Sequence, residues 1–331
     1  MENVYTKSGA LARRIYFGAT TVWENLYYFL QKRVLADGGT FVENDVLISD
    51  AGASLILTPN AYKVGKLYSA KPYFGAGDFT VDRDSEATYV DEDGIIKTAL
   101  ANVPRIDWST GVPIVLREGQ STNLVLTSDS GNYGGSPPAS EISAIAPDGT
   151  NEAIRPVPES NSNRYEETVG AGVYSSGQKL TYSWYRKRFS TPVDDSFIGD
   201  LNVFNSVNIN IETSIQINSN INGYDRFSVT VEIIDGISNS IFRAYFGFTI
   251  RVGNSSVAYW GHQFEEGSKA TSYTPTNGTT VTRLADNISV PTPAGVTSIT
   301  ETIDGVEQAP ITTIPATYSL PVGNINKVTM L

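Results

Sequence analysis

Residues 259–276 read Y-W-G-H-Q-F-E-E-G-S-K-A-T-S-Y-T-P-T, and this stretch decides the class of fold. Its first half predicts one strand with large apolar side chains at or beside a core, at Tyr259, Trp260 and Phe264. A polar turn follows. The Thr/Ser/Tyr/Pro segment after the turn cannot be helical, because Pro275 holds the residue before it out of the α region. The stretch therefore predicts a β fold.

The composition agrees with a chain made of sheets and turns. Charged residues make up only 18% of it, while Thr, Ser, Asn, Gly and Tyr are abundant. Many β-branched and aromatic residues with few charges are typical of strands. The 331 residues suffice for one large β domain with appendages or for two domains. Surfaces of this type suit contacts with proteins or sugars better than contacts with charged small molecules.

Several kinds of chemistry are excluded by the residue types. The chain has no cysteine, which excludes disulfides, thiolate metal sites and cysteine nucleophiles. Its single histidine, His262, excludes multi-histidine metal sites, and we expect no cofactor. The formal charge of −11 argues against nucleic acid as a partner, because phosphate binding needs a basic surface. No apolar run of about 18 residues occurs, so no membrane insertion is expected.

Residues 9–35 are the one convincing helix in the sequence. Apolar residues recur there at alternating helical steps and form one stripe, and the Asp37-Gly38-Gly39 run ends the helix. Two interpretations stay open: the helix covers one end of the chain's own sheet, or it docks onto another subunit. The second interpretation predicts attachment and oligomerisation anchors at Trp23, Leu26, Tyr27, Phe29 and Leu30.

The chain divides into segments of different character. Residues 1–39 form the helical attachment segment, and residues 40–79 form a connector of short strands separated by breakers such as Pro59-Asn60. Residues 80–286 form the main β domain. Residues 287–331 contain five prolines, which exclude a helix and suit extended edge strands or arms.

The main domain carries the longest alternating patterns. Residues 207–211 and 228–233 show strict period two, which indicates strands with one buried and one wet face. Residues 147–150, Pro-Asp-Gly-Thr, predict a tight turn. Short strands with turn signals between them predict an antiparallel two-sheet sandwich, and we assign a jelly roll. The main strands are expected at residues 123–127, 180–189, 203–212, 226–234 and 240–251.

Acidic residues are weak candidates for chemistry. Residues 91–94, Asp-Glu-Asp-Gly, lack the complete calcium-loop pattern and favour a hairpin turn. Glycoside hydrolysis needs two carboxyls that face each other across a sugar. The adjacent pairs at 166–167 and 194–195 do not supply that, because neighbours on a strand point to opposite faces, and residues 265–266 are expected in a turn. We expect no enzymatic activity.

His262 and a few aromatic residues are the candidate binding or catalytic groups. A catalytic His262 would need a nucleophile and an orienting acid beside it, so a partly buried or surface histidine is favoured. Asn132 and Tyr133, among small residues in a loop, are candidate glycan contacts, with simple anchoring of the loop as the alternative. Other aromatics are interpreted as exposed, with core packing as the favoured alternative for Trp184; they are Tyr165, Tyr174, Trp184 and Tyr185.

Several stretches resemble the concanavalin A-like jelly-roll domains of bacteriophage head-fibre and tail-fibre proteins. Those domains close with W-G-x-Q-L-E-x-G-S-x-A-T-S-Y-I-P-T followed by V-T-R-x-A-D. Residues 260–276 and 281–286 match this text, with Phe264 for the Leu and Thr274 for the Ile. Further matches are D-F-T-x-x-R-x-S-x-A-T-Y-x-D-x-x-G at 78–94, P-R-I-D-Y at 104–108, where Trp108 replaces the Tyr, and E-x-Q-x-T-N-L at 118–124.

The resemblance implies a bacteriophage virion component that is attached by its N-terminal part and shows a lectin-like sandwich outward. Residues 30–70 also look like the lead-in of such proteins in phages of Bacteroidetes. We expect a capsid-attached head fibre or decoration protein for host-surface adhesion, because the chain lacks the long repetitive shaft of a tail fibre. The alternatives are a tail-associated, glycan-binding receptor spike and a polysaccharide hydrolase. The implied partners are copies of the chain in a homotrimer, other virion proteins of capsid or tail, and a host surface glycan.

Overall fold

The computed structural model describes residues 41–43, 46–48, 53–59, 62–63, 65–69, 78–129, 140–157, 165–189, 200–203, 209–211, 215–234, 237–246 and 257–331. The predicted helix at 9–35, with the anchors Trp23, Leu26, Tyr27, Phe29 and Leu30, lies outside these residues. So do the candidate glycan contacts Asn132 and Tyr133. Within the described ranges every regular element is a strand, and every strand pair with a defined register is antiparallel. The prediction of a mainly antiparallel β protein is confirmed there.

The chain forms two compact units. One comprises Met1–Val81 and Asn287–Leu331, and the other comprises Asp82–Asp286. We call them unit 1 and unit 2. Unit 2 is therefore an insertion in the sequence of unit 1. No helix in the described residues is long and apolar enough to cross a membrane.

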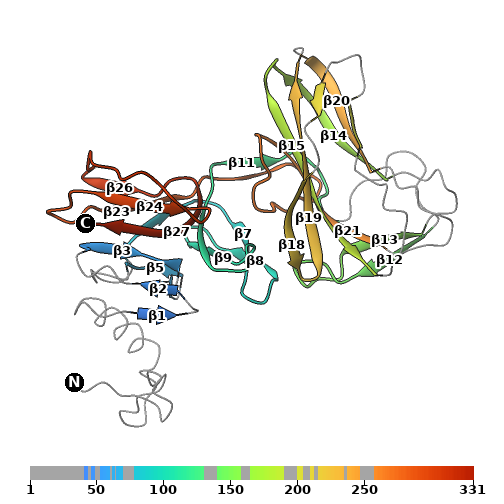
Figure 1. Ribbon diagram of the computed structural model, residues 1–331. Coiled ribbons are helices and arrows are strands. Elements are labelled where there is room, and N and C mark those ends of the chain that lie inside the picture. Colours follow the sequence, from blue (N-terminus) through green and yellow to red (C-terminus); the bar gives the residue numbers. More distant parts are fainter. Residues whose placement is uncertain are drawn as a thin grey trace, which may run out of the picture. The chain divides into compact units, whose positions relative to one another are not determined.

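Unit 2 contains a seven-stranded sheet in which β15 (Lys179–Arg188) lies between β19 (Tyr224–Ile233) and β21 (Val257–Glu266) (Figure 1). β-branched and aromatic residues favour these long strands, and residues 180–185 of the central strand β15 are buried on both faces. Its remaining strands are β12 (Ser140–Ala144), β13 (Ala153–Val157), β17 (Ile209–Ile211) and β18 (Ile215–Ile221).

A second, three-stranded sheet of unit 2 runs in the order β14, β20, β16. These strands are β14 (Tyr165–Tyr174), β20 (Ile237–Phe246) and β16 (Asp200–Val203). Three shorter antiparallel pairs complete the unit. They are β7 (Ala87–Val90) with β8 (Ile96–Ala99), β9 (Arg105–Asp107) with β10 (Ile114–Arg117), and β11 (Ser121–Asn123) with β22 (Val281–Arg283).

Unit 1 joins strands from both ends of the chain. β3 (Leu55–Leu57) pairs with β27 (Gly323–Met330), which pairs on its other side with β24 (Ile299–Ile303). All three residues of β3 are fully buried, because apolar side chains lie on both faces of this strand. The remaining strands are β1 (Phe41–Glu43), β2 (Val46–Ile48), β4 (Tyr62–Lys63), β5 (Lys66–Leu67), β6 (Thr80–Asp82), β23 (Asn287–Pro291), β25 (Val306–Glu307) and β26 (Thr317–Ser319).

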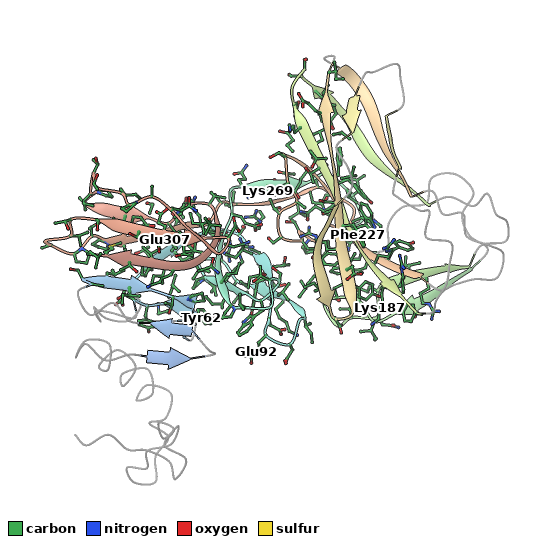
Figure 2. All side chains as sticks on the ribbon, in the orientation of Figure 1. Tyr62, Glu92, Lys187, Phe227, Lys269 and Glu307 are labelled. Atoms are coloured by element: carbon green, nitrogen blue, oxygen red, sulfur yellow. The ribbon has the colours of Figure 1, made fainter. Side chains whose placement is uncertain are left out.

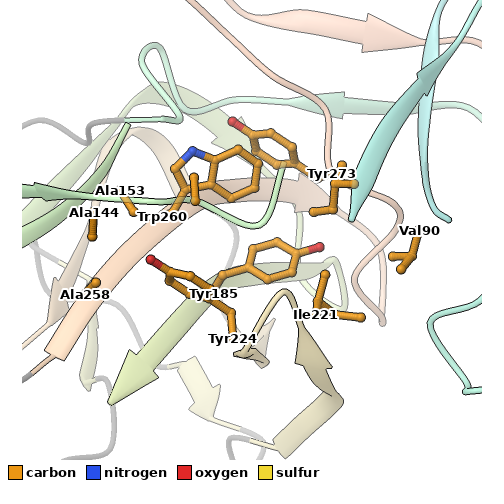
Figure 3. Packing of buried hydrophobic residues seen from close by; sticks show 11 residues of the cluster. Val90, Ala144, Ala153, Tyr185, Ile221, Tyr224, Ala258, Trp260 and Tyr273 are labelled. Carbon is orange, nitrogen blue, oxygen red and sulfur yellow. The ribbon is translucent and has the colours of Figure 1, made fainter. Parts of the chain in front are cut away.

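The core of unit 2 gathers around aromatic rings (Figure 3). The ring centroids of Trp260 and Tyr273 lie 4.3 Å apart, and those of Tyr185 and Trp260 lie 5.5 Å apart with an edge-on geometry. Such pairs add about 1 kcal/mol beyond their buried area. Phe264 and Trp184 are buried as well, so the prediction that Trp184, Trp260 and Phe264 lie in or beside the core is confirmed.

Some local expectations are corrected. Tyr174 and Tyr185 are buried rather than exposed, because β14 and β15 direct them into the packed interior. Glu265 and Glu266 belong to β21 and not to the turn after it. Residues 91–94 do form a turn, in the β7–β8 hairpin, where Gly94 has a φ of 76° and Glu92 is exposed (Figure 2).

Candidate functional site

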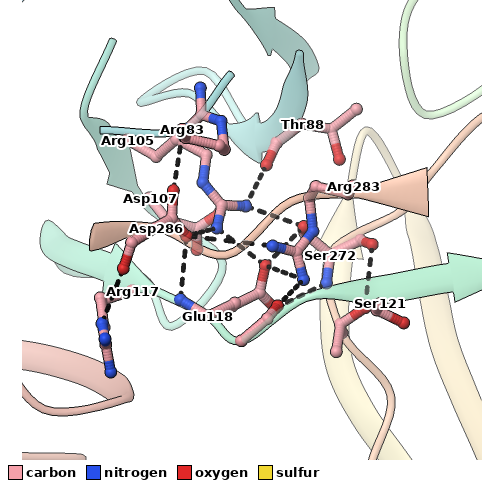
Figure 4. A network of polar contacts seen from close by, with 12 residues as sticks. Arg83, Thr88, Arg105, Asp107, Arg117, Glu118, Ser121, Ser272, Arg283 and Asp286 are labelled. Carbon is pink, nitrogen blue, oxygen red and sulfur yellow. Dashed lines mark hydrogen bonds and ion pairs between the residues drawn. The ribbon is translucent and has the colours of Figure 1, made fainter. Parts of the chain in front are cut away.

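The main polar feature of unit 2 is a buried network of three arginines and two carboxylates, centred on Asp286 (Figure 4). Asp286 follows β22. Its Oδ1 accepts a hydrogen bond from Arg83 Nη1 at 2.6 Å, and its Oδ2 accepts one from the backbone N of Glu118 at 2.9 Å. Arg105 Nη2 also donates to Oδ2. Both the Asp286 and the Arg83 side chains are at most 1% exposed, so this charge pairing is shielded from solvent.

Arg105, on β9, links three segments of the chain. Its Nη1 donates to the carbonyl of Thr88 at 2.9 Å and to Ser272 Oγ at 2.8 Å. Its Nη2 lies 2.9 Å from Glu118 Oε2. Burial opposes the charge of Arg105, but Glu118 and Asp286 outweigh burial and raise its pKa.

Glu118 is the second carboxylate of the network. It accepts hydrogen bonds from Ser272 N at 2.7 Å and from Ser272 Oγ at 2.6 Å, and Arg283 Nη2 lies 3.4 Å from its Oε2. Burial by itself would raise the pKa of Glu118. The charges of Arg105 and Arg283 and the bonds from Ser272 outweigh burial and lower that pKa to about 2.

The arginines also hold backbone carbonyls. Arg83 Nη2 donates to the carbonyl of Leu100 at 2.8 Å, and Arg283 Nη2 donates to that of Gly119 at 2.8 Å. Arg117 Nε donates to the carbonyl of Asp286 at 2.8 Å. A guanidinium has several donors in a fixed plane, so one side chain can bind a carboxylate and a carbonyl together. The network thus joins the residue 83–118 segment to the segment around β22.

A second polar cluster binds the extended segment 271–276, which follows β21 and is called the tail segment below. Glu265 Oε1 accepts from Gln263 Nε2 at 2.7 Å and from Thr271 N at 2.8 Å, while Oε2 accepts from Thr271 Oγ1 at 2.7 Å and from Ser121 Oγ. Gln263 Oε1 in turn accepts from Thr274 N at 2.7 Å. Glu265 is fully buried, and the bonds that its oxygens accept compensate for its desolvation.

Asn123, at the end of β11, also binds the tail segment. Its Nδ2 donates to the carbonyl of Thr274 at 2.8 Å and to that of His262 at 3.2 Å. Its Oδ1 accepts from Phe264 N at 3.1 Å. One amide side chain therefore links β11, β21 and the extended segment after it.

His262 is fully buried, whereas the sequence favoured a partly buried or surface position. Its Nδ1 lies 2.7 Å from the hydroxyl of Tyr182. Burial lowers its pKa to about 3, so the ring is neutral at ordinary pH. The arrangement is that of a core histidine with a hydrogen-bonded neighbour.

The predicted site residues and the observed clusters are different sets. The described residues contain no group of three or more His, Cys, Asp or Glu side chains that could hold a metal ion. The network residues were not predicted as a site from the sequence. The available signal was that Arg83, Arg105, Glu118, Arg283 and Asp286 are all fixed letters of the matched motifs. The same holds for Asn123, Gln263, Glu265, Thr271 and Ser272.

Comparisons with known proteins identify no family for the chain. No protein-family model matches the chain, and no curated protein matches it. Among solved structures, the chain is similar to one described as the structure of the tripod (BppUct-A-L) from the baseplate of bacteriophage Tuc2009. The sequence identity is 13% and the TM-score 0.24, over 78% of this chain and 98% of that chain. A likeness of this size assigns neither a family nor a function.

Proposed function

We propose that the protein is a structural component of a bacteriophage particle that displays unit 2 as a lectin-like jelly-roll domain. The observation that carries the proposal is the position of the motif residues in the structure. The polar motif residues shared with phage head-fibre and tail-fibre domains form the buried network and the cluster around Glu265. They bind one another and the backbone, which is the role of residues that specify a fold.

Within the particle, we place the protein on the capsid as a head fibre or decoration protein for adhesion to the host surface. The support is the sequence, in which residues 40–79 leave no room for the long repetitive shaft of a tail fibre. Residues 1–39 would supply attachment, and the resemblance favours a homotrimer. A tail-associated spike that binds glycans is the alternative, with Asn132 and Tyr133 as its candidate contacts.

Labelling of intact particles with an antibody against unit 2 tests the placement. We expect label on the head, whereas label on the tail tip would support the spike, and absence from purified particles would overturn both. A glycan array with the full chain separates adhesion from a purely structural role. Release of reducing sugar from host capsule, abolished by an Asp or Glu substitution, would establish the hydrolase alternative instead.

A chain that lacks residues 1–36 tests the attachment segment. The truncated protein should remain folded and soluble but should no longer join particles. The expected anchors are Trp23, Leu26, Tyr27, Phe29 and Leu30. Sedimentation at the oligomeric mass of the full chain, together with normal incorporation into particles, would contradict this role.

A further inference from the structure

The chain leaves and re-enters unit 1 through neighbouring strands. Unit 1 ends at Val81 and resumes at Asn287. β6 contains the last residues before unit 2, and β23 contains the first residues after it. These two strands are hydrogen-bonded neighbours in one sheet. The 205 residues of Asp82–Asp286 thus start and finish at paired strands.

Inside unit 2, the two ends of the insertion are also held together. Arg83, its second residue, binds Asp286, its last residue, at 2.6 Å across a sequence separation of 203 positions. Two residues further in from Arg83 and from Asp286, the backbone N of Leu284 donates to Ser85 Oγ at 3.0 Å. The ends of unit 2 are therefore closed by a buried ion pair and a flanking hydrogen bond.

We propose that the bonds Arg83–Asp286 and Ser85–Leu284 form a clasp that makes unit 2 a self-closing insert. When the clasp opens, the segments 83–102 and 281–286 open together, while the seven-stranded sheet of unit 2 and the sheets of unit 1 stay folded. The clasp is a property of the fold and does not depend on the proposed virion function.

Physical reasons favour a local opening of this kind. Removing one partner of a buried ion pair leaves an uncompensated charge in the interior, which favours opening. The tail segment has its own bonds to β21 and β11 through Glu265 and Asn123, so it does not depend on the clasp. Proteins commonly open in such cooperative parts below the global unfolding free energy.

Hydrogen exchange of the full chain tests the clasp, with the variant Asp286→Asn. Two reporter amides are Asn102 N, which donates to the carbonyl of Arg83, and Asp286 N, which donates to that of Glu118. In the variant both should exchange on the order of 100-fold faster. Ile233 N, bonded to Gln178 O in unit 2, and Leu320 N, bonded to Ile288 O in unit 1, should keep their rates. Equal acceleration at all four amides, or at none, would overturn the proposal.

A covalent substitute distinguishes a clasp from general damage to the core. The chain has no cysteine, so Ser85→Cys with Leu284→Cys can form only one intramolecular disulfide. Added to Asp286→Asn, the oxidised pair should restore slow exchange at Asn102, and reduction should remove the effect. No restoration on oxidation would show that Asp286 acts only through its buried charge, and the proposal would fail.

Two further variants keep the test decisive. Asp304→Asn changes an exposed aspartate of unit 1 and should leave all four amides unchanged. If Asp286→Asn does not fold, Ser85→Ala removes only the bond to Leu284. It should speed exchange several-fold at residues 83–102 and 281–286 and nowhere else. Unchanged exchange at both segments in Ser85→Ala would then count against the clasp.

Discussion

The Cδ2 atom of Tyr185 lies 2.8 Å from the point where a Cβ would stand on Gly261. Gly261 also has a φ of 66°, a conformation that L side chains rarely adopt. The pairing of β15 with β21 shifts register between Ser183 and Tyr185, opposite Gln263 and Trp260. Gly261 therefore permits the bulge that brings the Tyr185 and Trp260 rings together.

Gly261→Ala should destabilise the protein by about 2 to 4 kcal/mol, from the left-handed backbone and from the clash with the Tyr185 ring. Gly278→Ala is the matched control, because Gly278 has a φ of 82° but no atom within 4 Å of its would-be Cβ. That control should cost about 1 kcal/mol. Urea unfolding measures both, and equal costs for the two variants would argue against the steric role of Tyr185.

Glu118 should make the protein sensitive to acid. Its pKa is lowered from 4.5 to about 2 in the folded state, so its contribution to stability is complete above about pH 4.5 and is lost as the pH falls to about 2. A shift of this size corresponds to about 3 kcal/mol. Glu118→Gln should therefore be less stable than wild type at pH 7, and the difference between them should shrink between pH 4.5 and pH 2.

The control for Glu118 is Glu92→Gln, at the exposed tip of the β7–β8 hairpin. Its unfolding free energy should follow that of wild type at every pH. Denaturant midpoints measured at pH 7, 4.5, 3 and 2 supply the comparison. A constant difference between wild type and Glu118→Gln across this range would contradict the proposed ionisation of Glu118.

His262 should stay neutral across the usual pH range. Its pKa is lowered from 6.5 to about 3 by burial. Between pH 6.5 and pH 3, His262 is therefore protonated in the unfolded chain but neutral in the folded chain. Stability from this group is complete above about pH 6.5 and decreases as the pH falls toward 3. Because the chain has one histidine, its imidazole NMR signals are unambiguous. They should not move between pH 8 and pH 5 in the folded protein, and should titrate near pH 6.5 in urea.

The sequence predicts the class of fold and part of the core, because alternation along a strand is a local signal. The burial of His262 had such a signal too, since it alternates with Phe264 on β21, but its polarity favoured a partly buried or surface position over a fully buried one. The pairing of Leu57 with Val328 has no local signal, because it joins distant parts of the chain. Composition and periodicity do not encode which strands meet.

From the sequence, the residues of the buried network could be recognised only as members of the matched motifs. Arg83 and Asp286 are each charged residues in short segments, and charged residues are normally exposed. Their burial depends on the three-dimensional meeting of the 83–118 and 281–286 segments. The motif residues are visible in the sequence, whereas their pairing and their structural role require the fold.

Trp260 should be a major contributor to the stability of unit 2. The ring is 1% exposed and lies between Tyr185 and Tyr273, with centroid distances of 5.5 and 4.3 Å. Trp260→Ala removes these contacts and leaves a cavity, so it should lower the free energy of unfolding by about 3 to 5 kcal/mol. Phe189→Ala, at a 43% exposed aromatic in the same unit, should cost about 1 kcal/mol or less. Thermal or urea unfolding gives both values.

If the two variants melt alike, or Trp260→Ala melts like the parent, the ring does not lie in the packed interior. Trp260 lies in the core of unit 2, so the exchange of Leu320 N in unit 1 should stay unchanged.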